Sequence, residues 1–181
     1  MFVAAILVGC STKFFTSTEK QFAHELEFNS NSLWKIIIVS GEEEKFSGIL
    51  AIQQSSDFIS LALLDPTGIT LLRGDVGHSG DIRLASSLDK LNKSKIKSYL
   101  GKAIFRIFYL SPSEETCQKW LNRLCWAQTN SSSLIEKKSN VGPFLFWSAS
   151  YITDGRVNGK ISKIEFYTPR NKTKLFLELI N

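Results

Sequence analysis

The feature that most constrains the fold is a change in hydrophobic period along the chain. Up to residue 85, and again from residue 134 onward, apolar and polar residues tend to alternate, which is typical of half-buried β-strands. Between residues 96 and 108 the apolar residues recur at every third or fourth position, which is typical of an amphipathic helix. The sequence therefore predicts strands, then helical structure, then strands again.

Short turns separate the predicted strands. The clearest is Asp65-Pro66-Thr67-Gly68, where proline presets φ and glycine accepts a positive φ. Successive strands joined by short turns predict an antiparallel meander. The predicted strands span residues 20–28, 33–39, 46–53, 58–64, 69–73, 81–85, 134–140, 144–152, 161–168 and 174–180.

Two consecutive helices are predicted in the middle of the chain. The first spans residues 96–109 and has one broad apolar face. The second spans residues 112–126, and its start is indicated by a capping box with proline at the first helical position. Basic residues cover the polar side of the first helix: Lys95, Lys97, Lys102 and Arg106.

These elements predict a mainly β protein with two helices, of the α+β class. We expect a strongly curved, unclosed antiparallel half-barrel whose concave face is covered by the two helices, because apolar residues there must be shielded from water. Helices that fill the concavity only in part leave an apolar cavity. The candidates for lining it are Leu50, Ile52, Ile59, Leu61, Leu63, Phe144, Phe146, Ile164, Phe166, Leu175 and Leu177.

The N-terminus carries a second informative pattern. The run Leu7-Val8-Gly9-Cys10-Ser11 follows an apolar stretch, residues 2–8, and resembles the lipobox of bacterial lipoproteins. The resemblance implies a signal peptide over residues 1–9, a lipidated tether over 10–19 that begins at Cys10, and a single domain over 20–181. The alternative is a buried strand followed by an ordinary core thiol. The apolar run is far too short to cross a bilayer, which needs about 20 residues.

Residues 46–52, 59–64 and 65–71 resemble the early hairpins of the lipoprotein localisation factors LolA and LolB. The similarity is closer still to an uncharacterised family of LolB-like lipoproteins from biosynthetic clusters for aryl polyenes and related acyl products, in which two helices and a late Asp-Gly-Arg turn follow, as Asp154-Gly155-Arg156 does here. The resemblance implies an unclosed barrel that holds acyl chains. With Ser11 after the lipidated cysteine, it also implies an outer-membrane anchor facing the periplasm.

The charge of the chain is consistent with a lipid-facing role. The formal net charge is +5, which suits anionic lipid head groups as well as nucleic acid. No basic stripe interleaved with aromatic residues is present to indicate nucleic-acid binding. We therefore expect a membrane partner through the N-terminal lipid, no nucleic acid, and a monomer.

Signals for catalysis are weak. The sequence has no nucleophile elbow, Walker loop or zinc-protease motif. Asp75, His78 and Ser79 lie close together in a glycine-rich stretch, but a triad is defined by geometry and not by adjacency. We expect a protein that is not an enzyme, with no metal and no cofactor.

Cys117 and Cys125 are eight residues apart in the second predicted helix. At 1.5 Å rise per residue they would lie about 12 Å apart, beyond the roughly 7 Å that a disulfide spans. We therefore expect two buried thiols.

Together these observations lead to one expectation and one alternative. We expect a lipid-anchored protein that binds acyl chains, a lipid or lipoprotein, or another apolar ligand without catalysis, as a carrier or receiver. The alternative is a structural or interaction lipoprotein with a filled core, acting in an envelope or biosynthetic complex. A second competitor is an accessory hydrolase or acyltransferase, which would need a histidine beside a nucleophile in a pocket.

Overall fold

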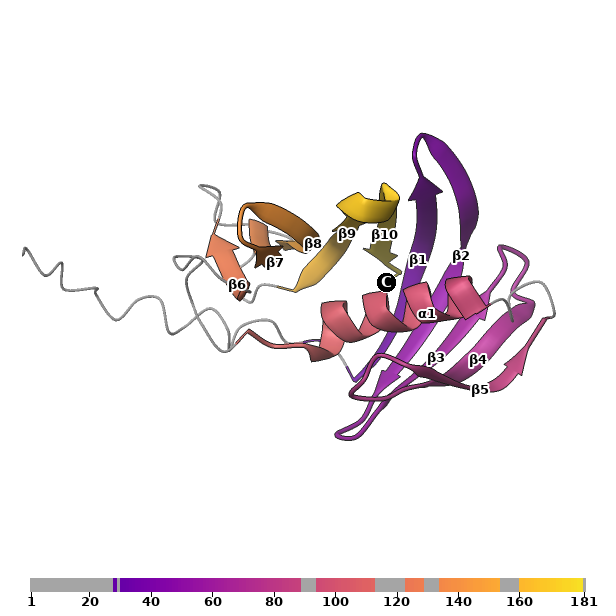
Figure 1. Cartoon of the computed structure of the whole chain (residues 1–181). Helices are drawn as coiled ribbons and strands as arrows, with labels where there is room; N and C mark the ends of the chain where they lie inside the picture. Colours follow the sequence, from indigo (N-terminus) through magenta and orange to yellow (C-terminus); the bar gives the residue numbers. More distant parts are fainter. Residues whose placement is uncertain are drawn as a thin grey trace, which may run out of the picture.

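The computed structural model describes residues 28, 30–88, 94–112, 123–128, 134–153 and 160–180. Within these residues, ten strands form one antiparallel sheet in the order β5-β4-β3-β2-β1-β10-β9-β8-β7-β6. The edge strands β5 and β6 do not pair with each other, so the sheet is unclosed (Figure 1). We call β1 to β5 the first arm of the sheet and β6 to β10 the second arm.

The strands are 6 to 12 residues long, and several of the strand pairs contain a register shift. They are β1 (Asn31–Ser40), β2 (Glu43–Gln54), β3 (Ile59–Leu64), β4 (Thr70–Val76), β5 (Ile82–Ser87), β6 (Arg123–Gln128), β7 (Leu134–Val141), β8 (Phe144–Thr153), β9 (Ile161–Thr168) and β10 (Thr173–Leu179). Nine of the ten predicted strands are confirmed. The predicted strand over residues 20–28 lies outside the described residues except for Phe28, which belongs to no strand.

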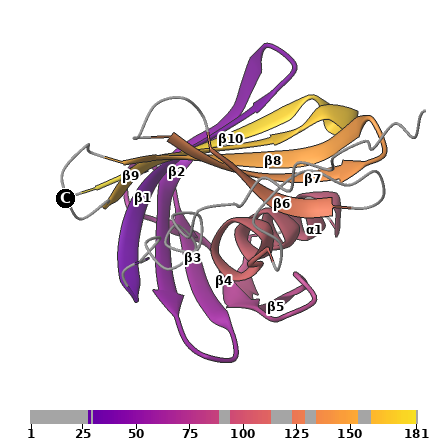
Figure 2. The ribbon, with the colours of Figure 1, turned by 90° about the vertical axis from the view of Figure 1, so that its left-hand side faces the viewer.

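Among the described residues, the sheet curves around one α-helix in its concavity, α1 (Ser94–Ile104), as Figure 2 shows. Alternation along the strands decides which side chains face that helix. In β2, Leu50 and Ile52 are buried on the concave face, whereas Gln53 is exposed on the convex face. The mainly β, unclosed and curved antiparallel architecture is therefore confirmed.

The first predicted helix is also confirmed. Its apolar face buries Leu100, Ile104 and Ile107 against the sheet. After Ile104 the helix widens into one π-helical turn, η2 (Phe105–Tyr109), in which the Leu110 amide donates to the Phe105 carbonyl oxygen at 2.9 Å. A short 3₁₀ turn, η3 (Pro169–Asn171), connects β9 to β10. No helix within the described ranges has the length and apolar character needed to cross a membrane.

The second predicted helix is wrong at its C-terminal end. Residues 123–126 belong to β6, which pairs with β7 and places Leu124 opposite Ser139 and Trp126 opposite Lys137. The segment is ambiguous because Leu124 and Trp126 also fit a period of two, and β7 offers an edge for pairing. The rest of that predicted helix lies outside the described residues, as do the predicted signal peptide, the tether and Cys10.

The turn between β3 and β4 forms as predicted. The Asp65 Oδ1 atom accepts hydrogen bonds from the amides of Thr67 and Ile69, both at 2.9 Å, and from the Thr67 hydroxyl. These donors, the Thr67 hydroxyl first, lower the pKa of Asp65. Gly68 has a φ of 88°, a conformation that costs little without a Cβ.

Candidate functional site

The centre of the concavity is filled with packed side chains. Nine of the eleven predicted cavity residues lie there, and each is at most 4% exposed. They belong to one core cluster with Leu100, Ile104 and Ile107 of the helical segment. They are Leu50, Ile52, Ile59, Leu61, Leu63, Ile164, Phe166, Leu175 and Leu177.

The other two predicted cavity residues face away from the concavity. Phe144 is 72% exposed and Phe146 is 52% exposed. In β8 the concave face is instead occupied by Trp147, Ala149 and Tyr151, which are all buried. The prediction that Phe144 and Phe146 line a cavity is therefore wrong, because apolar residues occur on both faces of β8 and the alternation was assigned to the wrong one.

A hollow of about 730 Å³ lies between the helix and the β9 end of the sheet. We call it the side pocket. It falls within the usual size range of small-molecule sites, roughly 300–1,000 Å³. Polar and basic groups from the helix and from η3 line it, and Phe166 also borders it, although the Phe166 side chain is buried. Its lining residues are Ser98, Tyr99, Lys102, Arg106, Phe166, Thr168 and Asn171.

The polar groups of the side pocket are only partly satisfied. Within the described residues the buried Tyr99 hydroxyl has no partner in hydrogen-bond geometry. Burial raises the pKa of Tyr99 to about 12, while nearby Thr168 and the Arg106 charge act in the opposite direction. Arg106 is half-buried, its pKa is lowered by burial, and its guanidinium lies 5.5 Å from the centroid of the Trp147 ring. A polar or anionic group entering the pocket would therefore find one partly desolvated cation, Arg106, while the Tyr99 hydroxyl is buried beside Thr168.

The side pocket exists because the helix is held against the opposite arm. Gly101 of α1 packs directly on Gly80 in the turn before β5, where an added Cβ would lie 2.4 Å from the Gly80 carbonyl oxygen. Gly80 itself has a φ of 75°. A helix pressed so closely against the first arm leaves space on its β9 side. The signal that sequence reasoning missed is this glycine inside a helical pattern, which often marks close packing.

A smaller hollow of about 280 Å³ lies beyond the C-terminal end of η2, and we call it the end pocket. Its most unusual member is Lys137 of β7, which is only 2% exposed. The Lys137 Nζ atom donates to the carbonyl oxygens of Ile107 at 3.0 Å and Leu110 at 2.8 Å. The sequence analysis did not identify this lysine. The lining residues are Phe28, Gln54, Ile107, Phe108, Tyr109, Leu110, Ser111, Trp126 and Lys137.

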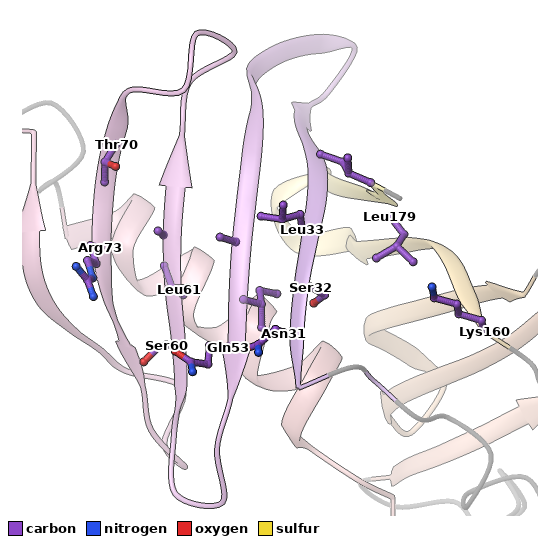
Figure 3. A pocket seen from close by; sticks show the side chains of 14 residues that line it. Asn31, Ser32, Leu33, Gln53, Ser60, Leu61, Thr70, Arg73, Lys160 and Leu179 are labelled. Carbon is purple, nitrogen blue, oxygen red and sulfur yellow. The ribbon is translucent and has the colours of Figure 1, made fainter.

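The third hollow is an open groove of about 720 Å³ on the convex face of the first arm. Figure 3 shows it from that side, with Arg73, Ser60 and Gln53 on strands that the helix covers from behind. Leu33 and Leu179 form its apolar end. Two of the predicted cavity residues, Ile52 and Leu61, also border it, but their side chains are buried. The groove is similar to the side pocket in volume and in how far it opens to solvent, but it lies on the face of the sheet that the helix does not cover.

The acid, imidazole and hydroxyl groups near residue 78 do not form a catalytic triad. Asp75 accepts from the Ser60 hydroxyl at 2.6 Å, and Ser79 donates to Asp81 at 2.9 Å. The His78 Nε2 atom lies 3.1 Å from the Tyr109 hydroxyl oxygen instead. In the part of the chain that the structure describes, no group of three or more His, Cys, Asp or Glu side chains is arranged to hold a metal ion.

Cys125 is part of a disulfide. Its side chain is buried on the convex side of β6, and its partner lies outside the described residues. The prediction of a free thiol is therefore wrong. The argument for it assumed a helical rise between residues 117 and 125, and Cys125 is on a strand.

Comparisons with known proteins do not identify a family or a function for this chain. No protein-family model matches the sequence, and no curated protein does. Among solved structures, the chain is similar to a DUF1329 family protein from Desulfovibrio piger ATCC 29098, with 8% sequence identity and a TM-score of 0.35. The match covers 88% of this chain and 87% of the other. A similarity at this level shows neither a family nor a function, so the proposals below are based on the chain itself.

Proposed function

We propose that the protein is an outer-membrane lipoprotein that faces the periplasm and binds an acyl chain or another apolar ligand in the side pocket, without catalysis, as a carrier or receiver of lipid or lipoprotein. The observation that carries the proposal is the position of the side pocket. It lies inside the curved sheet, against the helix and beside Phe166, which is where a LolA/LolB-like half-barrel would hold an acyl chain.

The side pocket offers both halves of an amphiphile a suitable environment. Burying an alkyl chain beside Phe166 gains about 0.8 kcal/mol per CH₂ group. An acidic or phosphorylated head would lie near Arg106 and Lys102, which line the same pocket. Because a membrane buries the same chain equally well, a ligand held in this way exchanges with a bilayer at little net cost.

Two further features support an exported, membrane-facing protein. The lipobox-like sequence ending at Cys10 would supply a lipid anchor, and the disulfide at Cys125 fits an oxidising compartment such as the periplasm. The hairpin between β7 and β8 carries three exposed apolar side chains, Val141, Phe144 and Phe146, which we call the apolar tip. Aromatic side chains of this kind favour the interface of a bilayer.

Native mass spectrometry with palmitate as the probe tests the proposal. The full chain carrying Cys10→Ala is used, so that no covalent lipid adds to the mass. We expect one palmitate adduct, which Ser98→Trp removes because the indole occupies part of the pocket and obstructs the acyl chain. The matched control is Lys97→Trp, since Lys97 is the neighbouring residue on the same helix and is not part of the pocket lining. Circular dichroism first establishes that both variants keep the parent spectrum.

Each other result has a defined meaning. A parent chain with no adduct overturns acyl binding and favours the filled-core scaffold, for which the nine packed residues under the helix are the supporting observation. An adduct that survives Ser98→Trp as well as Lys97→Trp shows that palmitate does not occupy the side pocket.

A further inference from the structure

Lys137 is a buried cation whose partners, in the described part of the chain, are main-chain carbonyls. Its ammonium group donates to the carbonyl oxygens of Ile107 and Leu110 at the end of η2. The Ile107 oxygen also accepts from the Tyr151 hydroxyl at 2.7 Å. An ammonium has three N–H donors, so these two bonds leave one donor for a further acceptor.

No acidic group compensates this charge among the described residues. Burial alone lowers the pKa of Lys137 to about 7, with no contribution from a neighbouring carboxylate. Facing groups from the other elements are aromatic or uncharged. They include the Trp126 ring at 5.2 Å, the Tyr151 ring at 5.4 Å and the amide of Gln54.

The charged groups nearest in the chain are directed elsewhere. Glu136, the preceding residue of β7, pairs with Lys138 at 2.8 Å on the opposite face of the strand. Arg106 of η2 lies over the Trp147 ring. The Tyr151 hydroxyl remains neutral because burial raises its pKa. A buried cation without a counter-charge is costly, and a single anion beside it offsets that cost.

The end pocket provides space for such an anion. Lys137 lines a volume of about 280 Å³ together with the aromatic side chains of Phe28, Phe108 and Trp126. This volume is near the lower end of small-molecule sites. One positive charge balances one negative charge, so a dianion such as phosphate would leave a surplus negative charge beside the buried Lys137. The accessible surface of the pocket is more polar than apolar, so it suits a small ligand with only a short apolar body beside its charged group.

We propose that the end pocket binds a small monocarboxylate with an alkyl or aryl body, whose carboxylate pairs with the Lys137 ammonium. The site is separate from the side pocket, since the two share no lining residue. This proposal can therefore be correct or wrong whether or not the side pocket binds an acyl chain.

Isothermal titration calorimetry with octanoate tests the site, using the full chain with Cys10→Ala at pH 8. Octanoate that pairs with Lys137 must bring a proton with it, because the free amine is largely neutral at that pH. We expect uptake of about one proton, measured by repeating the titration in buffers of different ionisation enthalpy. An anion that pairs with an ammonium group already protonated at pH 8 causes no proton uptake, so the uptake distinguishes the buried lysine from charged groups at the surface.

The variants give a second, independent readout. We expect Lys137→Met to weaken octanoate binding about tenfold or more, as expected when a hydrogen bond to a charged group is lost. Lys138→Met, the next residue on the opposite face of β7, should leave affinity and proton uptake unchanged. The neutral analogue 1-octanol should bind more weakly than octanoate.

Three results would overturn the proposal: no octanoate binding, binding without proton uptake, or equal affinity in a folded Lys137→Met chain. If Lys137→Met fails to fold, the proton uptake of the parent chain, measured in buffers of different ionisation enthalpy, still tests the proposal. The Ser98→Trp chain separates the two pockets, because it should lose the palmitate adduct and keep the octanoate-linked proton.

Discussion

The two arms of the sheet hold the same helix in different ways. The first arm meets it at a glycine-on-glycine contact, Gly80 against Gly101, with no room for a methyl group. The second arm also contacts it through polar side chains, namely Lys137 and Tyr151, which both donate hydrogen bonds to the Ile107 carbonyl oxygen. The first arm therefore fixes where the helix lies. The helix and the second arm together supply the residues that could recognise a ligand.

The difference follows from what each arm presents to the helix. Close apolar packing leaves no space and tolerates no added volume. Hydrogen bonds from side chains to main-chain carbonyls hold elements at a greater separation, so hollows remain beside them. Both the side pocket and the end pocket include second-arm residues, Phe166 in one and Lys137 in the other.

The largest expected effect concerns the charge that the second arm buries. Below pH 7 both the folded and the unfolded chain hold the Lys137 proton, so this group adds no slope to stability. Between pH 7 and the ordinary value of 10.5, the unfolded chain holds more of this proton than the folded chain, so stability rises with pH. Relative to Lys137→Met, the free energy of unfolding should gain roughly 3–5 kcal/mol across that range.

Urea denaturation of the two chains at a series of pH values measures this gain. Taking the difference between the chains removes the contributions of the other titrating groups. Parallel stability curves would show that Lys137 titrates normally, and the two arms would then no longer differ in the way described.

The next largest effect tests the close packing of the first arm against the helix. Gly101→Ala should destabilise the protein by about 1–3 kcal/mol, as overpacking does, even though alanine favours a helix by about 1 kcal/mol over glycine. Ser98→Ala, on the pocket side of the same helix, should change stability by no more than about 0.5 kcal/mol. Chemical denaturation of both variants is the measurement. A Gly101→Ala chain as stable as the parent would mean that the first arm does not fix the helix.

The arms also differ in how far the sequence predicted them. In the first arm, alternation in β2 and β3 correctly identified Leu50, Ile52, Leu61 and their neighbours as inward-facing. The residues between them on the opposite face, Ala51, Ser60 and Ala62, are smaller, so the bulky aliphatic residues mark one face of these strands. In the second arm, β8 reads Phe-Leu-Phe-Trp-Ser-Ala-Ser-Tyr, with apolar residues on both faces. Pattern alone could not assign its faces, and Phe144 and Phe146 were misplaced.

The candidate sites were harder to predict than the strands. Phe166 was identified as a pocket residue, but Tyr99 and Thr168 were not, since their positions depend on how closely the helix approaches the first arm. Lys137 stands beside Lys138 in a short polar strand, a pattern that normally indicates two exposed lysines. Its burial depends on contacts with η2 that lie 27 and 30 residues away in the chain, and no local pattern reports them.

A third prediction extends the comparison to the hairpin tips. The β1–β2 tip of the first arm is acidic, with exposed Glu43 and Glu44, whereas the β7–β8 tip of the second arm is apolar. Replacing Phe144 and Phe146 with serine should weaken binding to phosphatidylglycerol vesicles about tenfold, since each exposed aromatic contributes on the order of 1 kcal/mol or more at an interface. Vesicle sedimentation of the full chain with Cys10→Ala is the assay.

The matched control is the double replacement of Glu43 and Glu44 by serine. It should not reduce vesicle binding, because it removes negative charge from the other tip. If the two double variants sediment alike, the apolar tip has no special affinity for a bilayer, and the membrane contact in the proposed function would have to lie elsewhere.

The smallest expected effect is the most direct test of space on the second-arm side. Ser98→Trp places an indole where the side pocket offers about 730 Å³, so the free energy of unfolding should match that of Lys97→Trp within about 0.5 kcal/mol. A loss of 2 kcal/mol or more in Ser98→Trp alone would mean that the pocket closes around the helix in solution. Such closure would mean that the helix is tightly packed on both sides. The polar side chains of the second arm would then serve to hold the helix in place and not to bind a ligand.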